Sequence, residues 1–272
     1  MEIPFSIRYN NIKLKVERLY KTSDQPGKSL FPGIEDLSFN LKGGECVHLK
    51  SPGPWVNTLL LNALAGRTRI DAGAIWVEHQ RQWLNLPQLS ARQMGQIQTQ
   101  TIGYFPRSET LKSHLSVLDC ILAKFLDLEF SRADADRQCR RVLDWLGISR
   151  RLWDKPLADL PMTTLHQVNL ACTFAVDYAI IVFEPPISQL DQANQALLLE
   201  LIGYRKEKGT CFIGRFDQAE VRGRVCDRNL CIQVPTPTSV VPSTRTPAKA
   251  PTLIPIGIPT DVAVSSKAAH SY

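Results

Sequence analysis

Side chains that could carry out chemistry are scattered along this sequence rather than clustered. There is no Cys-x-x-Cys pair, and the five histidines stand at no metal-ligand spacing from the cysteines. No Ser/His/Asp or Cys/His arrangement suggests nucleophilic catalysis. The sequence therefore predicts no metal centre and no catalytic residues, and it predicts reduced, mostly buried thiols. The seven cysteines are Cys46, Cys120, Cys139, Cys172, Cys211, Cys226 and Cys231.

Basic residues form two short clusters, Arg140 with Arg141 and Arg150 with Arg151, which flank a helix-like stretch. The chain has 32 Lys and Arg against 26 Asp and Glu, a formal net charge of +6. A nucleic-acid-binding protein normally concentrates its positive charge on one face or run. A solvated helix face explains these arginines better, so no nucleic acid is expected as a partner.

The elements that must position any site are those of a protein of 272 residues, 44% hydrophobic and 21% charged. This size fits one large α/β domain or two small ones, with enough apolar residues for a core. No apolar run approaches the roughly 18–20 residues that span a bilayer. The first residues lack the charged-then-apolar layout of a signal peptide. We therefore expect a soluble protein of the cytoplasm.

The composition changes sharply near Val234, because residues 235–272 contain seven prolines in 38 residues. Proline at this density removes backbone donors and blocks both helices and central strands. We therefore predict a folded domain over residues 1–234 and a Pro-rich disordered or extended tail over 235–272. The apolar residues 253–258 could form a docking peptide, although a solvated tail is the simpler interpretation.

Strand-like and helix-like stretches alternate through the folded part. Period-two alternation predicts half-buried antiparallel strands near its start, and fully apolar runs predict buried strands later on. This order implies an α/β parallel sheet wrapped by helices, with antiparallel and helical additions. The predicted strands are 12–20, 35–41, 46–50, 74–78, 101–105, 179–183, 210–215 and 229–234, and the predicted helices are 57–65, 117–128, 133–146, 165–176 and 190–208.

Several stretches in this order carry a resemblance to a known family, among them GECVHL, TLLLNALAG, TIGYF, VNLACTFAVDYAIIVFEPP and QLDQANQALLLELI. With their spacing they resemble the nucleotide-binding domain of ABC ATPases. The sequence is most similar to the ABC-type subunit of the phosphonate carbon–phosphorus lyase system, and next to lipoprotein-release-type export ATPases. The resemblance covers nearly all of residues 12–232. It implies a P-loop NTPase-like parallel sheet with an antiparallel β subdomain and a helical insert.

The phosphate loop of that family reads GxxxxGK[ST], whose backbone N–H groups, lysine and hydroxyl hold the phosphates and Mg²⁺. The matching stretch here is KSPGPWVNT, residues 50–58. Valine stands at the lysine position, and two prolines have no N–H to donate. Each lost charge-assisted hydrogen bond is worth about 1.5–3 kcal/mol. The residues that the resemblance leaves as a vestigial nucleotide site in this loop are Lys50, Ser51, Gly53, Asn57 and Thr58.

Other positions of the family's site are also changed. Arg107 stands where the resemblance expects a glutamine that senses Mg²⁺, and residues 160–164 (LPMTT) replace the LSGGQ-type signature. At the end of the strand 179–183, Glu184 could still hold a metal ion through water, but Pro185 replaces the catalytic carboxylate. Asp217 replaces the switch histidine and would repel a γ-phosphate. Together these changes predict that ATP is not hydrolysed.

A few residues have two interpretations. The adenine-stacking aromatic falls near Ser23, and Tyr20 is close enough to replace it. Lys50 and Arg107 are either ordinary surface residues or a site for another anion or an acidic partner. Trp55 is either a plug in the vacated pocket or a partner anchor. Asp191, in a loop that contacts the opposing subunit in ABC dimers, joins Trp55 and Arg107 as an interface candidate.

The sequence thus predicts a non-catalytic ABC ATPase-like protein, a pseudo-ATPase that acts as a structural or regulatory subunit. Its expected partner is another ABC-type subunit or a larger protein complex, with a membrane permease as a further candidate, and its expected location is the cytoplasm or the periphery of a membrane complex. No cofactor is expected. The alternative is an ABC transporter or phosphonate-system subunit that retains weak ATP binding or hydrolysis, with ATP and Mg²⁺ as its ligands.

Overall fold

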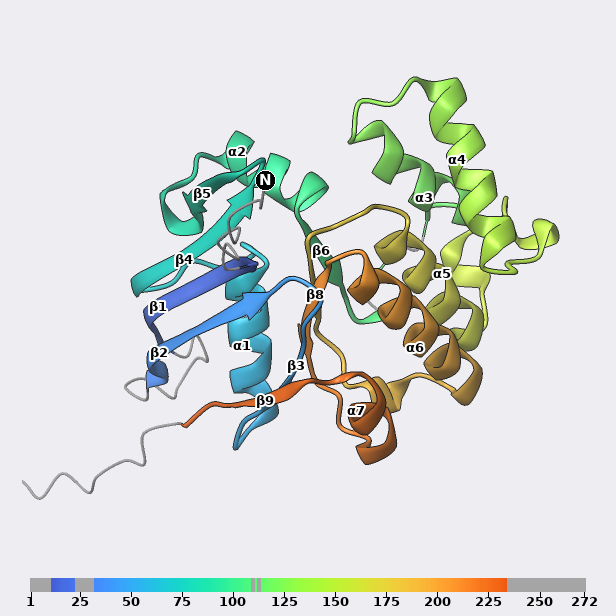
Figure 1. Ribbon diagram of the computed structural model, residues 1–272. Coiled ribbons are helices and arrows are strands. Elements are labelled where there is room, and N and C mark those ends of the chain that lie inside the picture. The colour runs from blue at the N-terminus through green and yellow to red at the C-terminus, as the bar shows by residue number, and fades with distance from the viewer. Residues whose placement is uncertain (1–10, 23–31, 109–110, 112–113, 234–272) are drawn as a thin grey trace, which may run out of the picture. The chain divides into compact units, whose positions relative to one another are not determined.

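The computed structural model describes residues 11–22, 32–108, 111 and 114–233. The chain divides into two compact units, residues 1–236 and 237–272, and the second lies outside the described residues. The predictions for the tail, for residues 253–258 and for Ser23 also lie outside them. The described residues therefore all belong to the first unit, which contains two β-sheets (Figure 1).

The larger sheet has five strands, and each of its pairings is parallel. Two of these strands are buried at every residue, which matches their apolar sequences. Because parallel strands need crossover connections, helices must cover both faces of this sheet. In spatial order the strands are β6 (Ile102–Phe105), β7 (Ile180–Phe183), β8 (Cys211–Gly214), β3 (Cys46–Lys50) and β9 (Arg228–Cys231).

The smaller sheet is antiparallel and has four strands. In β1, the side chains of Leu14, Val16 and Leu19 are buried, and the alternation breaks between the last two. The register with β2 shifts at that point, where Arg18 has φ 45°. Such a bulge re-aims the strand while its apolar residues stay in the core. The spatial order is β2 (Pro32–Lys42), β1 (Ile12–Thr22), β4 (Ala72–His79) and β5 (Gln82–Asn85).

Seven α-helices connect and cover the sheets in the described part of the chain. Figure 1 shows α1 beside the strands of both sheets, while α5 and α6 lie on the far side of the parallel sheet. A pair formed by α3 and α4 extends from α5, and these two helices are the predicted helical insert. The helices are α1 (Pro54–Leu64), α2 (Ala91–Gln100), α3 (Val117–Leu126), α4 (Arg132–Trp145), α5 (Met162–Phe174), α6 (Gln192–Glu207) and α7 (Ala219–Val225).

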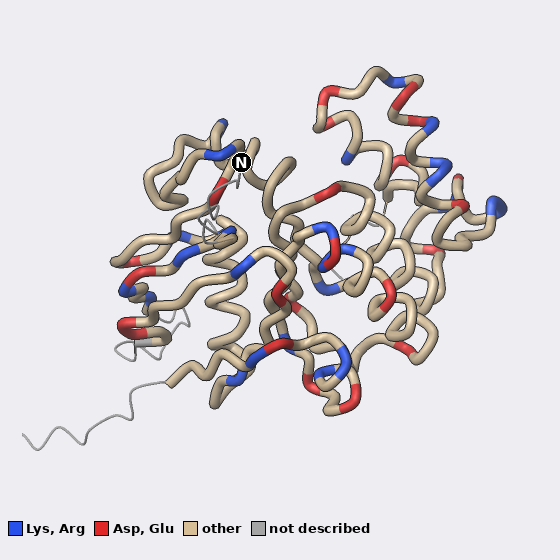
Figure 2. Tube along the Cα trace, in the orientation of Figure 1, with Lys and Arg blue, Asp and Glu red and all other residues tan. Residues whose placement is uncertain are grey.

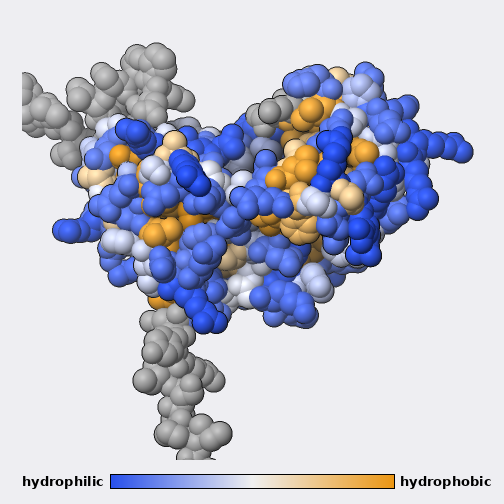
Figure 3. Space-filling view, turned by 90° about the horizontal axis from the view of Figure 1, so that it is seen from above, coloured by the Kyte–Doolittle hydropathy of each residue, from blue (hydrophilic) through white to orange (hydrophobic). Residues whose placement is uncertain are grey.

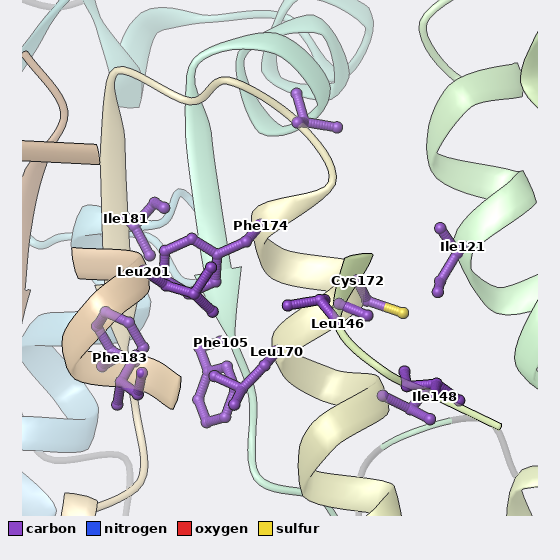
Figure 4. Packing of buried hydrophobic residues seen from close by; sticks show 14 of the residues in the cluster. Phe105, Ile121, Leu146, Ile148, Leu170, Cys172, Phe174, Ile181, Phe183 and Leu201 are labelled. Atoms are coloured by element: carbon purple, nitrogen blue, oxygen red, sulfur yellow. The ribbon is translucent and has the colours of Figure 1, made fainter. Parts of the chain in front are cut away.

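Strand β7 lies at the centre of the hydrophobic core because its alternate side chains enter two different clusters. Ile180 and Val182 pack on the side of α1 and the antiparallel sheet. Ile181 and Phe183 pack on the side of α5 and α6, and Figure 4 shows Phe183 beside the aromatic ring of Phe174. The ring of Phe183 lies 5.3–6.4 Å, centroid to centroid, from those of Phe105, Phe174, Phe212 and Phe216.

The predicted α/β architecture is confirmed, and the predicted elements match observed ones to within a few residues. Helix α1, however, begins at Pro54 rather than at residue 57, because proline fits the first turn of a helix, where its missing N–H has no partner to lose. The short elements β5, α2 and α7 were not predicted. Strand β5 depends on a turn in which Gln80 and Arg81 have positive φ. Glycine is the usual residue in such a turn, and its absence here left the turn unpredicted from the sequence.

Charges and thiols follow the sequence predictions. The two arginine clusters on and after α4 are partly neutralised, since Arg140 pairs with Asp136 and Arg150 with Asp144. Figure 2 accordingly shows basic and acidic residues interspersed along this helix. Four of the seven cysteines are buried, two are half-buried, and only Cys231 is exposed. Among the described residues, no helix combines the length and apolarity needed to cross a bilayer.

The aromatic cluster around Phe183 yields a stability prediction. Phe183→Ala should lower the free energy of unfolding of the full chain by about 3–5 kcal/mol, because it opens a cavity among rings that cannot fully close it. Trp145→Ala is the matched control: its side chain is 59% exposed, so its change should stay within about 0.5 kcal/mol. Urea unfolding measures both, and equal losses would contradict this description of the core.

Candidate functional site

The parallel strands bring the candidate residues to one edge of the sheet. Strands β3, β6, β7 and β8 run in the same direction, so the segments after them meet at the carboxyl edge. Ligands of open α/β sheets bind at this edge. The loop 50–58 follows β3, Arg107 follows β6, Glu184 and Pro185 follow β7, and Asp217 follows β8.

The loop between β3 and α1 forms hydrogen bonds within itself. Gly53, in an extended conformation, is the N-cap residue of α1, and its carbonyl oxygen accepts two hydrogen bonds. The Ser51 hydroxyl donates one at 2.7 Å, and the Val56 backbone N–H donates the other at 3.2 Å. Lys50, at the end of β3, is exposed. The predicted residues of this loop therefore lie together, but two of its donors already have partners in the loop.

The side chains that follow the loop turn into the protein. Val56, at the position where the family resemblance expects a lysine, is fully buried. Asn57 is 4% exposed, and its Oδ1 has no hydrogen-bond partner among the described residues. Thr58 is half-buried. A buried acceptor without a partner is costly, so Asn57 is the one residue of α1 whose polar group the fold itself does not explain.

Trp55 covers the loop from outside and reaches strand β2. A Cβ added at Gly53 would lie 2.8 Å from the indole Nε1, and one at Gly33 would lie 3.1 Å from the indole Cζ3. The two glycines thus make room for the ring. The side chain nevertheless remains 36% exposed, so the plug interpretation needs correction: the indole packs over the loop rather than filling a closed pocket.

Arg107 and Glu184 form an ion pair at the same edge. The Arg107 Nε lies 3.2 Å from the Glu184 Oε1, and the Arg107 backbone N–H donates to Oε2 at 3.4 Å. The glutamate side chain is only 11% exposed, whereas the arginine side chain is 42% exposed. Neither interpretation of Arg107 anticipated this contact, in which Glu184 faces a guanidinium.

Sequence reasoning missed the residues around this ion pair. The Tyr104 hydroxyl donates to Asn62 Oδ1 at 3.0 Å, and the Arg67 guanidinium lies 4.4 Å from the centre of the Tyr104 ring. Burial, with the negative charge of Glu184, raises the pKa of Tyr104, so its phenol stays protonated. The TIGYF sequence alone does not distinguish this tyrosine from a core residue. Its neighbours Asn62, Arg67 and Glu184 come from other parts of the chain, and only the tertiary structure places them beside it.

Pro185 lies beside a cavity that has both polar and apolar walls. It is buried, and the cavity, of about 290 Å³, is also lined by Phe105, Ser108, Met162, His166, Gln189 and Leu190. Proline offers no carboxylate and no N–H to polarise a water molecule in this space.

Asp191 serves the start of α6. As its N-cap it accepts the Asn194 backbone N–H at 3.0 Å and the Asn194 side-chain amide at 2.5 Å. That amide also donates to the Thr163 carbonyl at 2.8 Å, and His166 Nδ1 lies 3.9 Å from Asp191 Oδ2. Burial raises the pKa of Asp191, but the hydrogen bonds from Asn194 outweigh it, and the pKa is lowered. The interface candidate thus also joins α6 to the first turn of α5.

Two other predicted residues lie apart from these contacts. Asp217 accepts hydrogen bonds from the backbone N–H of Ser188, at 3.0 Å, and from its hydroxyl. Asp217 therefore holds the segment between β7 and α6 through Ser188. The expected repulsion of a phosphate by Asp217 stays a prediction. Tyr20 is half-buried in β1, where it pairs with Ala72. Its carbonyl oxygen accepts a hydrogen bond from the Asp71 backbone N–H at 3.0 Å. The predicted contact of Tyr20 with adenine stays a prediction.

The two sheets, with α1 directly after the loop that follows β3, form the mixed α/β nucleotide-binding fold of ABC ATPases. A dimeric post-hydrolysis structure of the ATP-binding cassette MJ0796 bound to ADP and Pi matches with a TM-score of 0.71. The match covers 81% of this chain and 94% of that chain at 17% sequence identity. At this identity the likeness shows the fold alone.

In sequence, the chain is similar to ATP-binding subunits of ABC transporters. The molybdate/tungstate import ATP-binding protein WtpC of Thermococcus kodakarensis is 27% identical over 177 residues, 65% of this chain and 50% of that protein. The lipoprotein-releasing system ATP-binding protein LolD of Chromohalobacter salexigens is 24% identical over 205 residues, 74% of this chain and 83% of that protein. The chain thus spans half the length of WtpC. No protein-family model matches the chain.

The predicted family resemblance is confirmed at the level of ABC transporter ATP-binding subunits, including the lipoprotein-releasing kind. The nearer likeness to the phosphonate carbon–phosphorus lyase system stays a prediction, as does the catalytic state of the pocket.

The network at Asp191 gives a prediction with a pH dependence. Asp191→Ala should lower the free energy of unfolding by about 0.5–2 kcal/mol, because an N-cap acceptor is lost. Asp191→Asn keeps a capping side chain and is the matched control, so it should cost less. Urea unfolding at neutral pH measures both changes, and equal losses would contradict the capping role of the side chain.

The pKa of Asp191 is lowered in the folded state, so its charge stabilises the fold above the ordinary carboxyl value of 3.8. That stabilisation is lost as the pH falls through the lowered value. Unfolding measured between pH 7 and pH 2 should therefore show the wild type and Asp191→Asn converging at the acid end. A constant difference across this range would contradict the assignment.

Proposed function

We propose that this chain is an ABC-type subunit that works in a complex with a second ABC subunit or with a membrane permease, at the periphery of the membrane. For its own pocket we propose weak ATP binding without hydrolysis. The transporter-subunit alternative from the sequence analysis therefore takes precedence over a scaffold unconnected with transport.

The observation that carries the first part is the extent of the likeness to transporter ATP-binding subunits. It runs through 74% of this chain and 83% of a LolD protein, a protein of a lipoprotein-releasing system. The ABC fold of the chain supports the same proposal, as does the WtpC likeness. Subunits of this kind assemble with partners, and the interface candidates Asp191 and Trp55 lie at the ends of helices at the carboxyl edge of the sheet.

The second part of the proposal rests on the site. Phosphoryl transfer depends almost entirely on positioning and charge stabilisation, and the groups that supply both are altered here. Val56 presents a buried apolar side chain at the start of α1, and Pro54 offers no N–H. Pro185 stands where a carboxylate would have to polarise a water molecule. These residues favour a subunit whose complex draws its hydrolytic activity from another chain.

Exposed apolar residues leave more than one surface for a partner. Figure 3 shows apolar side chains gathered at separate places on the viewed face, divided by polar ones, rather than in one continuous patch. The most exposed large apolar side chains of the described part include Trp145, Tyr204, Met162 and Trp83. The proposal therefore rests on the likeness and the site, and it assigns no docking face.

Nucleotide binding is tested by thermal unfolding of the full chain with ATP and MgCl₂ up to millimolar concentration. A ligand at 100 times its dissociation constant adds about 2.7 kcal/mol of stability, so tight binding would be obvious. We expect a small shift that does not saturate at millimolar ATP, and no phosphate release above that of buffer; the absence of any shift would contradict weak binding. Sodium chloride at matched ionic strength is the control. A saturable shift with phosphate release by the isolated chain would contradict the proposed pocket.

The assembly is tested by purifying the tagged full chain from its native cells in mild detergent and identifying stoichiometric components by mass spectrometry. An ABC subunit or a protein with several membrane spans, recovered in a fixed ratio, supports the proposal. A stoichiometric complex that contains neither, or a chain recovered alone, contradicts it.

A further inference from the structure

We propose that the Arg107 guanidinium is the resident cation at the carboxyl end of β7, in the place of the Mg²⁺ ion that the ABC fold implies. The protein groups of the site would then have no affinity of their own for divalent metal ions. This inference goes beyond the subunit function and holds whether or not the chain has a partner.

The first step of the argument is the coordination of the Glu184 carboxylate. Both of its oxygens accept hydrogen bonds from Arg107. Oε1 lies 3.2 Å from the Arg107 Nε, and Oε2 lies 3.4 Å from the Arg107 backbone nitrogen. The backbone of Glu184 is held as well, because its N–H donates to the Phe105 carbonyl at 3.1 Å. Strands β6 and β7 therefore fix both partners of the ion pair relative to each other.

The second step is the charge around this carboxylate. A second guanidinium, that of Arg67, lies over the ring of Tyr104, whose phenol is held protonated beside Glu184. The immediate surroundings thus contain two permanent positive charges and one carboxylate. A divalent cation would meet repulsion here, and it would have to displace the Arg107 guanidinium before it could reach the carboxylate.

The third step is the ligand set. Mg²⁺ requires near-octahedral oxygen coordination at about 2.0–2.1 Å, with anionic oxygens from the protein or its substrate. In the described part of the chain, no group of three or more His, Cys, Asp or Glu side chains could hold a metal ion. The unpartnered Oδ1 of Asn57 is one neutral oxygen in a buried position. The residues present therefore do not fit Mg²⁺, whereas they fit an arginine–carboxylate pair.

The test uses Mn²⁺ as the probe, read out by electron paramagnetic resonance of the free ion with the full-length chain and no nucleotide. The wild type should take up no Mn²⁺ in a saturable manner. Arg107→Glu should gain saturable binding, because it removes the guanidinium and sets a second carboxylate beside that of Glu184. Arg107→Asp is a second variant in case the first fails to fold. Adding Glu184→Gln to either variant should abolish the gain.

Arg150→Glu is the matched control, since it makes the same exchange in an ion pair with Asp144 on the exposed surface. It should leave Mn²⁺ uptake at the wild-type level. Saturable binding by the wild type that Glu184→Gln removes would overturn the proposal. So would the absence of a gain in a folded Arg107 variant, or a gain that survives Glu184→Gln. Because no partner or nucleotide takes part, these outcomes are independent of the proposed subunit function.

Discussion

The parallel sheet is buried on both faces, and the rest of the structure depends on that burial. Ile180 and Val182 leave β7 on one side, and Ile181 and Phe183 leave it on the other, so neither face can shift without opening the core. The sheet therefore holds the ends of its strands rigidly. The candidate site residues at the carboxyl edge are therefore positioned by the packing of the strands that precede them, rather than by their own loops.

The Arg107–Glu184 pair illustrates the consequence. The two residues are 77 positions apart in the chain, and they meet only because β6 and β7 pair in parallel from Ile102 with Ile180 to Phe105 with Phe183. A charge pair built on two adjacent buried strands loses little entropy when it forms, since the backbone has already been ordered. The paired strands β6 and β7 could place a carboxylate beside a metal ion, and here they place it beside a guanidinium.

The start of α1 and the start of α6 show how the fold holds these segments with residues other than those that the family resemblance expects. Pro54 and Gly53 are compatible with a helix start, and Val56 adds apolar burial, so the loop after β3 stays folded without an anion to bind. Asp191 keeps its capping hydrogen bonds to Asn194. The fold tolerates these residues because the scaffold derives its stability from the core, and a phosphate site contributes function rather than packing.

By itself, the sequence determined the α/β class, the order of most strands and helices, and the positions at the carboxyl edge, because apolar periodicity reports burial along the chain. It also predicted that Val56, Pro185 and Arg107 are unsuited to phosphate chemistry, and this stays a prediction. Only the tertiary structure decided what these residues contact: Arg107 reaches Glu184, Trp55 packs on Gly33, and Tyr104 joins Asn62. Such pairings depend on which strands become neighbours, and periodicity within one segment carries no information about its distant partner.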